Sequence, residues 1–166
     1  MMEASMIDRR QVLCAAAALA LQSSCAATRA DAPPSILFVC EHGCAKSLVA
    51  SLHFQRMAIA RSVRVRVMSR GVDPGPEVPE AICEGLARDG FDVSGFTPQR
   101  VRARDLRRSD YVVLISVNPD LAGRTAHVLR WDDVSALSEN YELARGELIT
   151  HLDALLQSIQ ANSAAR

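Results

Sequence analysis

A cysteine, a lysine and a serine lie close together in the stretch ILFVCEHGCAKSLVA, residues 36–50. Cys40 ends a short apolar run, and Lys46 and Ser47 stand where a helix is expected to begin. Backbone N–H groups of such a loop, together with the positive end of the helix, can hold a tetrahedral oxyanion. They also stabilise a thiolate, which is the nucleophilic form of cysteine. The stretch therefore predicts a thiol nucleophile beside an oxyanion-binding loop.

The loop between Cys40 and the helix is expected to form the anion site. Gly43 allows the backbone to bend toward the anion, and Ser47 is placed to donate its hydroxyl to the sulfur. Lys46 is the only lysine in a chain with 18 arginines. Two interpretations of it stay open, namely a side chain that binds the anion and a substitution in a disabled loop. The predicted oxyanion-binding residues are Glu41, His42, Gly43, Cys44, Ala45 and Lys46.

Strands and helices are expected to alternate around this loop. Uninterrupted or alternating apolar runs predict strands, and apolar residues three and four apart predict helices. The expected strands are 36–40, 63–69, 111–115 and, more weakly, 126–131; the expected helices are 45–60, 77–89, ended by Gly90, and about 139–159. This order predicts a single-domain α/β fold with a mainly parallel sheet flanked by helices. Cys40 would then lie at the carboxyl ends of the strands, where such sheets bind ligands.

Charge is balanced, with 19 basic and 19 acidic residues. Residues 1–32 carry equal numbers of each sign, so the remainder is neutral as well. A neutral domain has no general attraction to nucleic acid, and no nucleic-acid partner is expected. The local basic segment RVRARDLRR, residues 100–108, is interpreted as a solvated connection or, alternatively, as a docking patch for an acidic partner.

The N-terminal residues 1–32 have the pattern of an export signal. Arg9 and Arg10 precede the apolar run 12–21, which is too short to span a bilayer, and small residues follow it. The paired arginines suggest the twin-arginine route. The alternatives for processing are cleavage after Ala32, cleavage after Ala27 and lipidation of Cys25. Each would give an exported protein, either periplasmic or lipid-anchored, without a transmembrane segment after processing. A non-functional leader would instead leave the protein in the cytoplasm. A domain over 35–160 and a tail over 161–166 are expected to follow.

Cysteine usage does not predict a disulfide framework. Outside the leader the chain keeps three cysteines, Cys40, Cys44 and Cys83, and an odd number argues against a set of pairs. Cys44 either pairs with Cys40 under oxidation or is an inert neighbour. Cys83 lies off the apolar stripe of its expected helix and is not expected to take part in chemistry.

The loop VCEHGCAKS resembles the phosphate-binding loop of the low-molecular-weight protein tyrosine phosphatase superfamily, which includes thioredoxin-coupled arsenate reductases. In that family, a cysteine, five residues, an arginine and a serine follow an apolar strand. The segments MSRGVDPG, VPEAICEGLARDGFDVSGFTPQRV, RRSDYVVLIS and RWDD follow in the family's order. The resemblance covers nearly all of residues 35–159 and implies the family's fold.

The resemblance also implies a role for each matched residue. Cys40 would attack phosphorus and carry a phosphocysteine intermediate, Lys46 would take the place of the arginine that grips the oxyanion, and Ser47 would support the thiolate. Asp133, or alternatively Asp132, would protonate the leaving group and then activate water. The substrate would be a phosphorylated protein or a small phosphoester, and no cofactor or metal ion is expected.

Departures from the family's pattern keep three functions under consideration. Lys46 lacks the planar fork of arginine, Gly43 replaces the usual asparagine, and no proline follows either aspartate. His42 resembles the loop of arsenate-reductase-like members, although no cysteine follows the third strand, where the thioredoxin-coupled branch carries more. A cysteine-dependent phosphatase is the first hypothesis. An arsenate-reductase-like enzyme and a catalytically impaired module that binds phosphate or arsenate are the alternatives.

Overall fold

The computed structural model describes residues 32–117 and 127–164. The chain divides between Ala32 and Pro33, and the fold described below is that of the second unit. Apart from Ala32, the predicted leader lies outside the described residues, and export therefore stays a prediction. In the described part of the chain, no helix is both long enough and apolar enough to cross a membrane.

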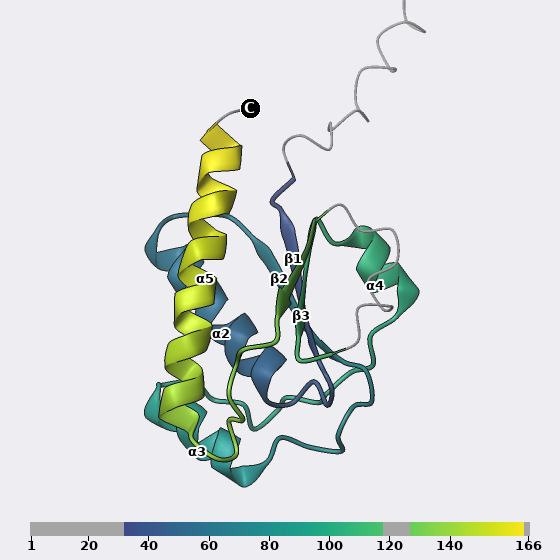
Figure 1. The fold of residues 1–166 in the computed structure, drawn as a ribbon, viewed down its shortest axis with the longest axis vertical. Coiled ribbons are helices and arrows are strands. Elements are labelled where there is room, and N and C mark those ends of the chain that lie inside the picture. The colour runs from purple at the N-terminus through teal and green to yellow at the C-terminus, as the bar shows by residue number, and fades with distance from the viewer. Residues whose placement is uncertain (1–31, 118–126, 165–166) are drawn as a thin grey trace, which may run out of the picture. The chain divides into compact units, whose positions relative to one another are not determined.

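The described residues form one sheet of four parallel strands (Figure 1). The strands are β1 (Ser35–Cys40), β2 (Arg66–Gly71), β3 (Tyr111–Ile115) and β4 (His127–Trp131), in the spatial order β2-β1-β3-β4. Cys40 pairs with Gly71, the last residue of β2, so the ends of the two strands are level. All of β1 is buried, as in sheets covered on both faces. The fold confirms the predicted α/β class.

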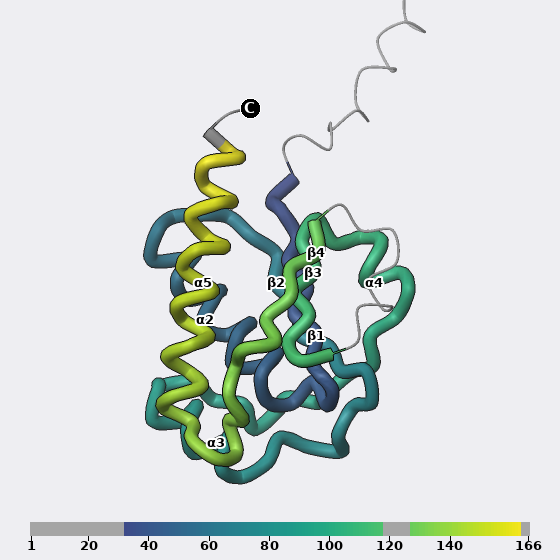
Figure 2. The backbone as a smooth tube through the Cα atoms, viewed as in Figure 1, coloured from purple at the N-terminus to yellow at the C-terminus, as the bar shows by residue number. Residues whose placement is uncertain are grey.

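Helices cover both faces of the sheet. Figure 1 shows α2 (Lys46–Ala60) and α5 (Tyr141–Ala164) on one face, with α3 (Glu80–Arg88) near the start of α5, and α4 (Ala103–Arg108) on the other. Figure 2 traces the same arrangement along the backbone. Alternate residues of β1 face different helices, because successive side chains of a strand point to opposite faces. Phe38 and Cys40 belong to the core under α2 and α5, whereas Leu37 and Val39 pack with Leu106 of α4.

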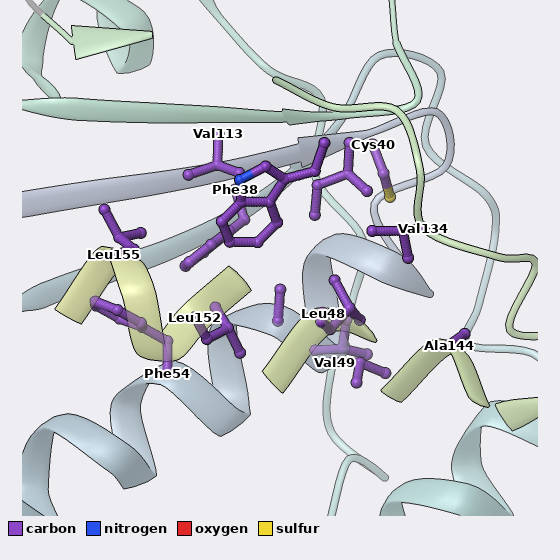
Figure 3. Packing of buried hydrophobic residues seen from close by; sticks show 14 of the residues in the cluster. Phe38, Cys40, Leu48, Val49, Phe54, Val113, Val134, Ala144, Leu152 and Leu155 are labelled. Atoms are coloured by element: carbon purple, nitrogen blue, oxygen red, sulfur yellow. The ribbon is translucent and has the colours of Figure 1, made fainter. Parts of the chain in front are cut away.

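The larger core brings the ends of several elements to the cysteine. Phe38 packs against Phe54 of α2 and against Trp131 of β4, with ring centroids 5.7 and 5.9 Å apart. Figure 3 shows Cys40 and Val134 at the same end of this cluster. The segment that follows β4 therefore reaches the loop that follows β1.

Three elements begin two or three residues later than the sequence pattern predicted. β2 starts at Arg66 rather than at 63, because its partner β1 starts at Ser35 and leaves residues 63–65 without a ladder. α3 starts at Glu80 rather than at 77, since a proline at 79 disfavours helical backbone at the residue before it. α5 starts at Tyr141 rather than at 139.

The start of α5 is set by a cap, because the Asn140 side chain accepts the backbone N–H of Leu143 at 3.0 Å. This helix also extends beyond the expected end at 159 into the predicted tail 161–166. That segment contains neither glycine nor proline to stop a helix.

α4 was not predicted. It lies in the basic segment that was interpreted as a connection. Its first turn is held by Asp105, whose carboxylate accepts the backbone N–H of Arg102 at 3.0 Å. Only Leu106 of this helix is buried.

Candidate active site

The Cys40 thiol lies between the end of β1 and the first turn of α2. Its sulfur is 3.0 Å from the Ser47 hydroxyl oxygen and 3.4 Å from the Ser47 backbone nitrogen. Cys40 is 5% exposed and Ser47 is fully buried, so these contacts are protected from bulk water. A hydroxyl and an N–H directed at sulfur are the donors that a thiolate needs.

A second serine supports the first one from β2. Ser69 is buried, and its hydroxyl lies 2.9 Å from the Ser47 oxygen and 3.4 Å from the Gly43 carbonyl. A proton on Ser69 that points at Ser47 leaves the Ser47 proton free to point at sulfur. The three side chains Ser69, Ser47 and Cys40 therefore form a chain of hydrogen bonds directed at the Cys40 sulfur.

Two glycines allow the loop to lie directly against the end of β2. Gly43 has φ +67°, and a Cβ built there would lie 2.6 Å from the Gly71 nitrogen. A Cβ on Gly71 would lie 2.7 Å from the His42 carbonyl carbon. Any larger residue at either position would push the two backbones apart, asparagine at position 43 included. The glycine that departs from the family's pattern is thus required by this packing.

Most backbone N–H groups of the loop have no acceptor within the described protein. Between described residues, the main chain of residues 41–46 donates a hydrogen bond only from Cys44, to its own thiol. The loop carbonyls, by contrast, are engaged: Val72 donates to the Cys40 carbonyl (3.1 Å), Asp73 to that of Glu41 (2.9 Å) and Gly75 to that of His42 (3.1 Å). A loop tied down through its carbonyls while its N–H groups stay available has the geometry of a cradle for an anion. All the predicted loop residues, Glu41 to Lys46, belong to it.

Lys46 joins three segments at the edge of this cradle. Its ammonium donates to the Ser116 hydroxyl (2.9 Å) after β3 and to the Val134 carbonyl (2.7 Å) after β4. Ser116 adopts φ +53°, which is unusual for a residue other than glycine. An ammonium has three donors, so one N–H is left for a bound oxyanion. Lys46 thus acts as a tether between loops as well as a positive charge.

The remaining loop side chains differ in exposure. His42 is exposed, and its Nδ1 lies 3.1 Å from the Asp73 carbonyl, which makes it a link to the loop after β2. Cys44 is buried, and its thiol is free, as are those of Cys40 and Cys83. Burial raises the pKa of the Cys44 thiol, and the charge of nearby Cys40 raises it further. The thiolate form of Cys44, which is the nucleophilic form, is therefore disfavoured.

Both predicted acid residues pair with other side chains in this structure. Asp132 accepts from the Arg130 guanidinium at 2.9 and 3.1 Å. Both carboxylate oxygens of Asp133 lie 3.1 Å from Nε2 of His151, a residue of α5 whose ring stacks on Trp131 at 4.9 Å. Neither carboxylate contacts Cys40, Ser47 or Lys46. The backbone next to Asp133 does reach the site, however, because Val134 accepts from Lys46.

Sequence reasoning did not identify Ser69, Ser116 or His151. Ser69 ends the predicted strand 63–69, and a polar residue at the carboxyl end of a parallel strand was the available signal. The contacts of Ser116 and His151 carried no comparable signal. Within the described residues, no group of three or more His, Cys, Asp and Glu side chains is arranged to hold a metal ion.

A buried thiol between a parallel strand and a helix, beside a loop with free backbone N–H groups, is the arrangement expected of a cysteine-based oxyanion site. Residues 35–148 match the family model described as low molecular weight phosphotyrosine protein phosphatase, and the chain belongs to this family. This confirms the resemblance noted in the loop.

Known relatives include arsenate reductases and phosphatases. A "putative arsenate reductase" of Halobacterium salinarum is 27% identical over 105 residues, which are 61% of this chain and 74% of that protein. The thioredoxin-dependent arsenate reductase of Corynebacterium glutamicum has a similar structure, with a TM-score of 0.66 at 26% identity over 80% of this chain; the match spans 64% of that enzyme. The YwlE arginine phosphatase of Geobacillus stearothermophilus shares the fold, with a TM-score of 0.65 at 19% identity over 81% of this chain and 97% of that one.

Proposed function

We propose that the protein is a cysteine-dependent phosphatase that hydrolyses phosphomonoesters through a phosphocysteine at Cys40. The observation that carries the proposal is the cradle itself, in which the backbone N–H groups of residues 41–46, apart from that of Cys44, lack a protein acceptor around a thiol that Ser47 contacts. Membership of the phosphatase family supports it. The substrate class is a phosphorylated protein or a small phosphoester.

In the first step the Cys40 thiolate attacks phosphorus, and the bond from phosphorus to the leaving oxygen breaks as the P–S bond forms. The equatorial oxygens are held by the loop N–H groups and by the third N–H of Lys46. The leaving oxygen needs a proton. We assign that proton to Asp133, with Asp132 as the alternative. Asp133 is 72% exposed, so its side chain has room to rotate away from His151.

In the second step water attacks phosphorus, the P–S bond breaks, and the thiolate leaves with its electron pair. The carboxylate that gave up its proton now accepts one from the water. Ser47 stabilises the departing thiolate, and Ser69 keeps the Ser47 hydroxyl oriented toward it. Phosphate is released, and the thiolate and the protonated acid are restored.

A second candidate function is arsenate reduction, favoured by the similarity to named arsenate reductases and by the presence of two cysteines, Cys40 and Cys44, in one loop. Cys40 would attack arsenate and expel hydroxide. Cys44 would then attack the Cys40 sulfur, so that arsenic leaves as arsenite with two electrons and a Cys40–Cys44 disulfide forms. A dithiol reductant would have to restore the thiols. Cys44 takes the resolving role here because no cysteine follows Cys83.

Turnover by the full-length, reduced protein separates these functions. With p-nitrophenyl phosphate we expect hydrolysis that Cys40→Ser abolishes, because a hydroxyl without a base is a poor nucleophile at neutral pH. Cys44→Ser is the matched control and should retain hydrolysis. Full activity of Cys40→Ser would contradict the proposal. Arsenate-dependent loss of two thiols with stoichiometric arsenite would favour the reductase instead.

A further inference from the structure

An arginine-lined hollow of about 330 Å³ lies on the α4 side of the sheet. Its lining residues are Arg70, Gln99, Arg100, Arg102, Arg104 and Asp105. Four guanidinium groups thus face one carboxylate in a domain that is neutral as a whole. This concentration of positive charge is a local property of one surface.

The carboxylates near the hollow do not neutralise it. Asp105 is shared, since it lies 3.6 Å from Arg70 and 3.8 Å from Arg104 while also capping α4. Arg100 pairs with Asp73 outside the hollow, at 2.7 Å. Among the described residues, Arg102 forms no ion pair. Arg100 and Arg104 are about 60% exposed, so their guanidinium groups can reach a partner.

The hollow adjoins the loop that carries Cys40. Arg100 donates to the Val72 carbonyl at 2.6 Å and to Asp73, and these two residues in turn donate to the Cys40 and Glu41 carbonyls. Arg70 pairs with Val39, one position before the Cys40–Gly71 pair. Neighbouring strands lie about 4.8 Å apart, so the Arg70 backbone is one strand spacing and one residue away from that of Cys40. About three extended residues, on the order of 10 Å, cover this separation and the reach of an arginine side chain.

We propose that this hollow binds acidic side chains of a protein substrate that flank the phosphorylated residue held at Cys40. This inference rests on the proposed phosphatase function and adds a substrate class to it. Arginine forks match carboxylates with two parallel hydrogen bonds. Nucleic acid fits less well, because the domain has no net positive charge to attract a long polyanion. Acidic residues within about three positions of the phosphorylated residue are the recognised feature.

The test compares two phosphotyrosine peptides that carry either glutamate or glutamine at the three positions on each side. The enzymes are the full-length protein, Arg102→Ala/Arg104→Ala, and the control Arg64→Ala/Arg66→Ala, whose exposed arginines lie at the opposite end of β2. We expect the wild type and the control to favour the glutamate peptide by about three- to tenfold in kcat/KM at low salt, the size of two exposed charge pairs. Arg102→Ala/Arg104→Ala should lose this preference, and its turnover of p-nitrophenyl phosphate should not change. Equal kcat/KM for both peptides in the wild type, or a preference that survives in the double variant, would overturn the proposal.

A binding measurement keeps this test separate from the phosphatase proposal. The probe is the unphosphorylated glutamate peptide, labelled for fluorescence anisotropy. Three- to tenfold weaker binding to Arg102→Ala/Arg104→Ala than to the control supports the docking site even if no phosphopeptide is hydrolysed, in which case only the proposed function fails. Equal binding by the two variants refutes the docking site. Tighter binding of a single-stranded oligonucleotide through the same arginines would also refute it, in favour of nucleic acid.

Discussion

At the scale of single residues, the position of the only lysine needs an explanation, because every other Lys or Arg position of the chain is an arginine. The Lys46 ammonium is a compact charge with three donors, and two of them hold Ser116 and Val134. It therefore fixes the ends of two loops while presenting one N–H to the cradle. An arginine at this position would present a wider planar group to the same two acceptors. Lysine thus suits a loop that must be both tethered and charged.

We predict that Lys46→Ala weakens phosphate binding by about 1.5–3 kcal/mol, the usual contribution of a hydrogen bond to a charged group. Lys46→Arg should bind phosphate at least as well as the wild type, because its fork can meet two oxygens. Ser116→Ala is the control, since it removes one tether and keeps the charge, and it should cost much less. Titration calorimetry with phosphate measures all three. The same affinity in wild type and Lys46→Ala would mean that the lysine does not touch the anion.

The geometry around Cys40 and its loop could be predicted from sequence because strand, loop and helix are contiguous there. Cys40, Ser47 and the loop 41–46 lie within one local segment whose geometry the residue types specify. Ser69 and Ser116 come from distant strands, and only the register of the sheet brings them to the loop. The partner of Asp133 could not be predicted either, since His151 reaches it from α5.

At the scale of elements, a buried polar cluster joins α2, α3 and α5. The Asp89 carboxylate, which follows α3 and is only 7% exposed, accepts from His53 of α2 (3.1 Å) and from Tyr141 of α5 (2.7 Å). Arg145 of α5 donates to the same carboxylate, and Arg56 donates to the Asp89 carbonyl at 2.6 Å. The cluster fixes the start of α5 against α2 and the end of α3.

Burial and hydrogen bonds together set the protonation states in this cluster. Burial raises the pKa of the Asp89 carboxyl, but hydrogen bonds from Tyr141 and Arg145 outweigh it and leave this pKa below its ordinary value. Burial lowers the pKa of His53, and the positive charges of Arg56 and Arg145 lower it as well. Together they outweigh the Asp89 carboxylate, which raises this pKa. Arg56 donates to Nδ1 of His53 at 3.1 Å, so the imidazole is neutral, with its proton on Nε2. A second proton on Nδ1 would face the Arg56 donor.

We predict that the free energy of unfolding falls as pH drops from about 7.5 to about 5.5. The folded protein holds His53 at a lowered pKa, so below about 6.5 the unfolded state binds more protons and gains stability. His53→Gln should flatten this slope. Tyr141→Phe keeps the imidazole, so it should lower stability by about 1–3 kcal/mol at every pH without removing the slope. Urea unfolding at a series of pH values measures both effects, and an unchanged slope in His53→Gln would count against this role.

Element boundaries were less predictable from sequence than element types. Nothing in the alternating run that begins at 63 marks where the strand starts. The start of β2 is set by its partner strand β1. α4 buries a single leucine, so it lacks the apolar repeat that indicates a helix. Its first turn depends on one aspartate cap. That short helix nevertheless places Arg102 and Arg104 beside the hollow.

At the scale of the whole molecule, the sequence order of strands and helices was enough to predict the fold class and the edge of the sheet at which the candidate site lies. A parallel sheet gathers its carboxyl ends on one edge, and there the segments after β2, β3 and β4 each contact the segment after β1. The distribution of charge over the folded surface was not predictable to the same extent. Net neutrality of the chain conceals a cradle and an arginine-lined hollow that are both suited to anions.

The central claim is that Cys40 forms a covalent bond to phosphorus, and trapping that bond tests it most directly. The reduced full-length protein is mixed with excess p-nitrophenyl phosphate and quenched during turnover, and its peptides are then measured by mass spectrometry. We predict one phosphoryl group on the peptide that contains Cys40 and none on that of Cys40→Ala, while Cys44→Ala still shows the modification. Continued turnover with no phosphoryl group on Cys40, or with the group on another residue, would contradict the proposed mechanism.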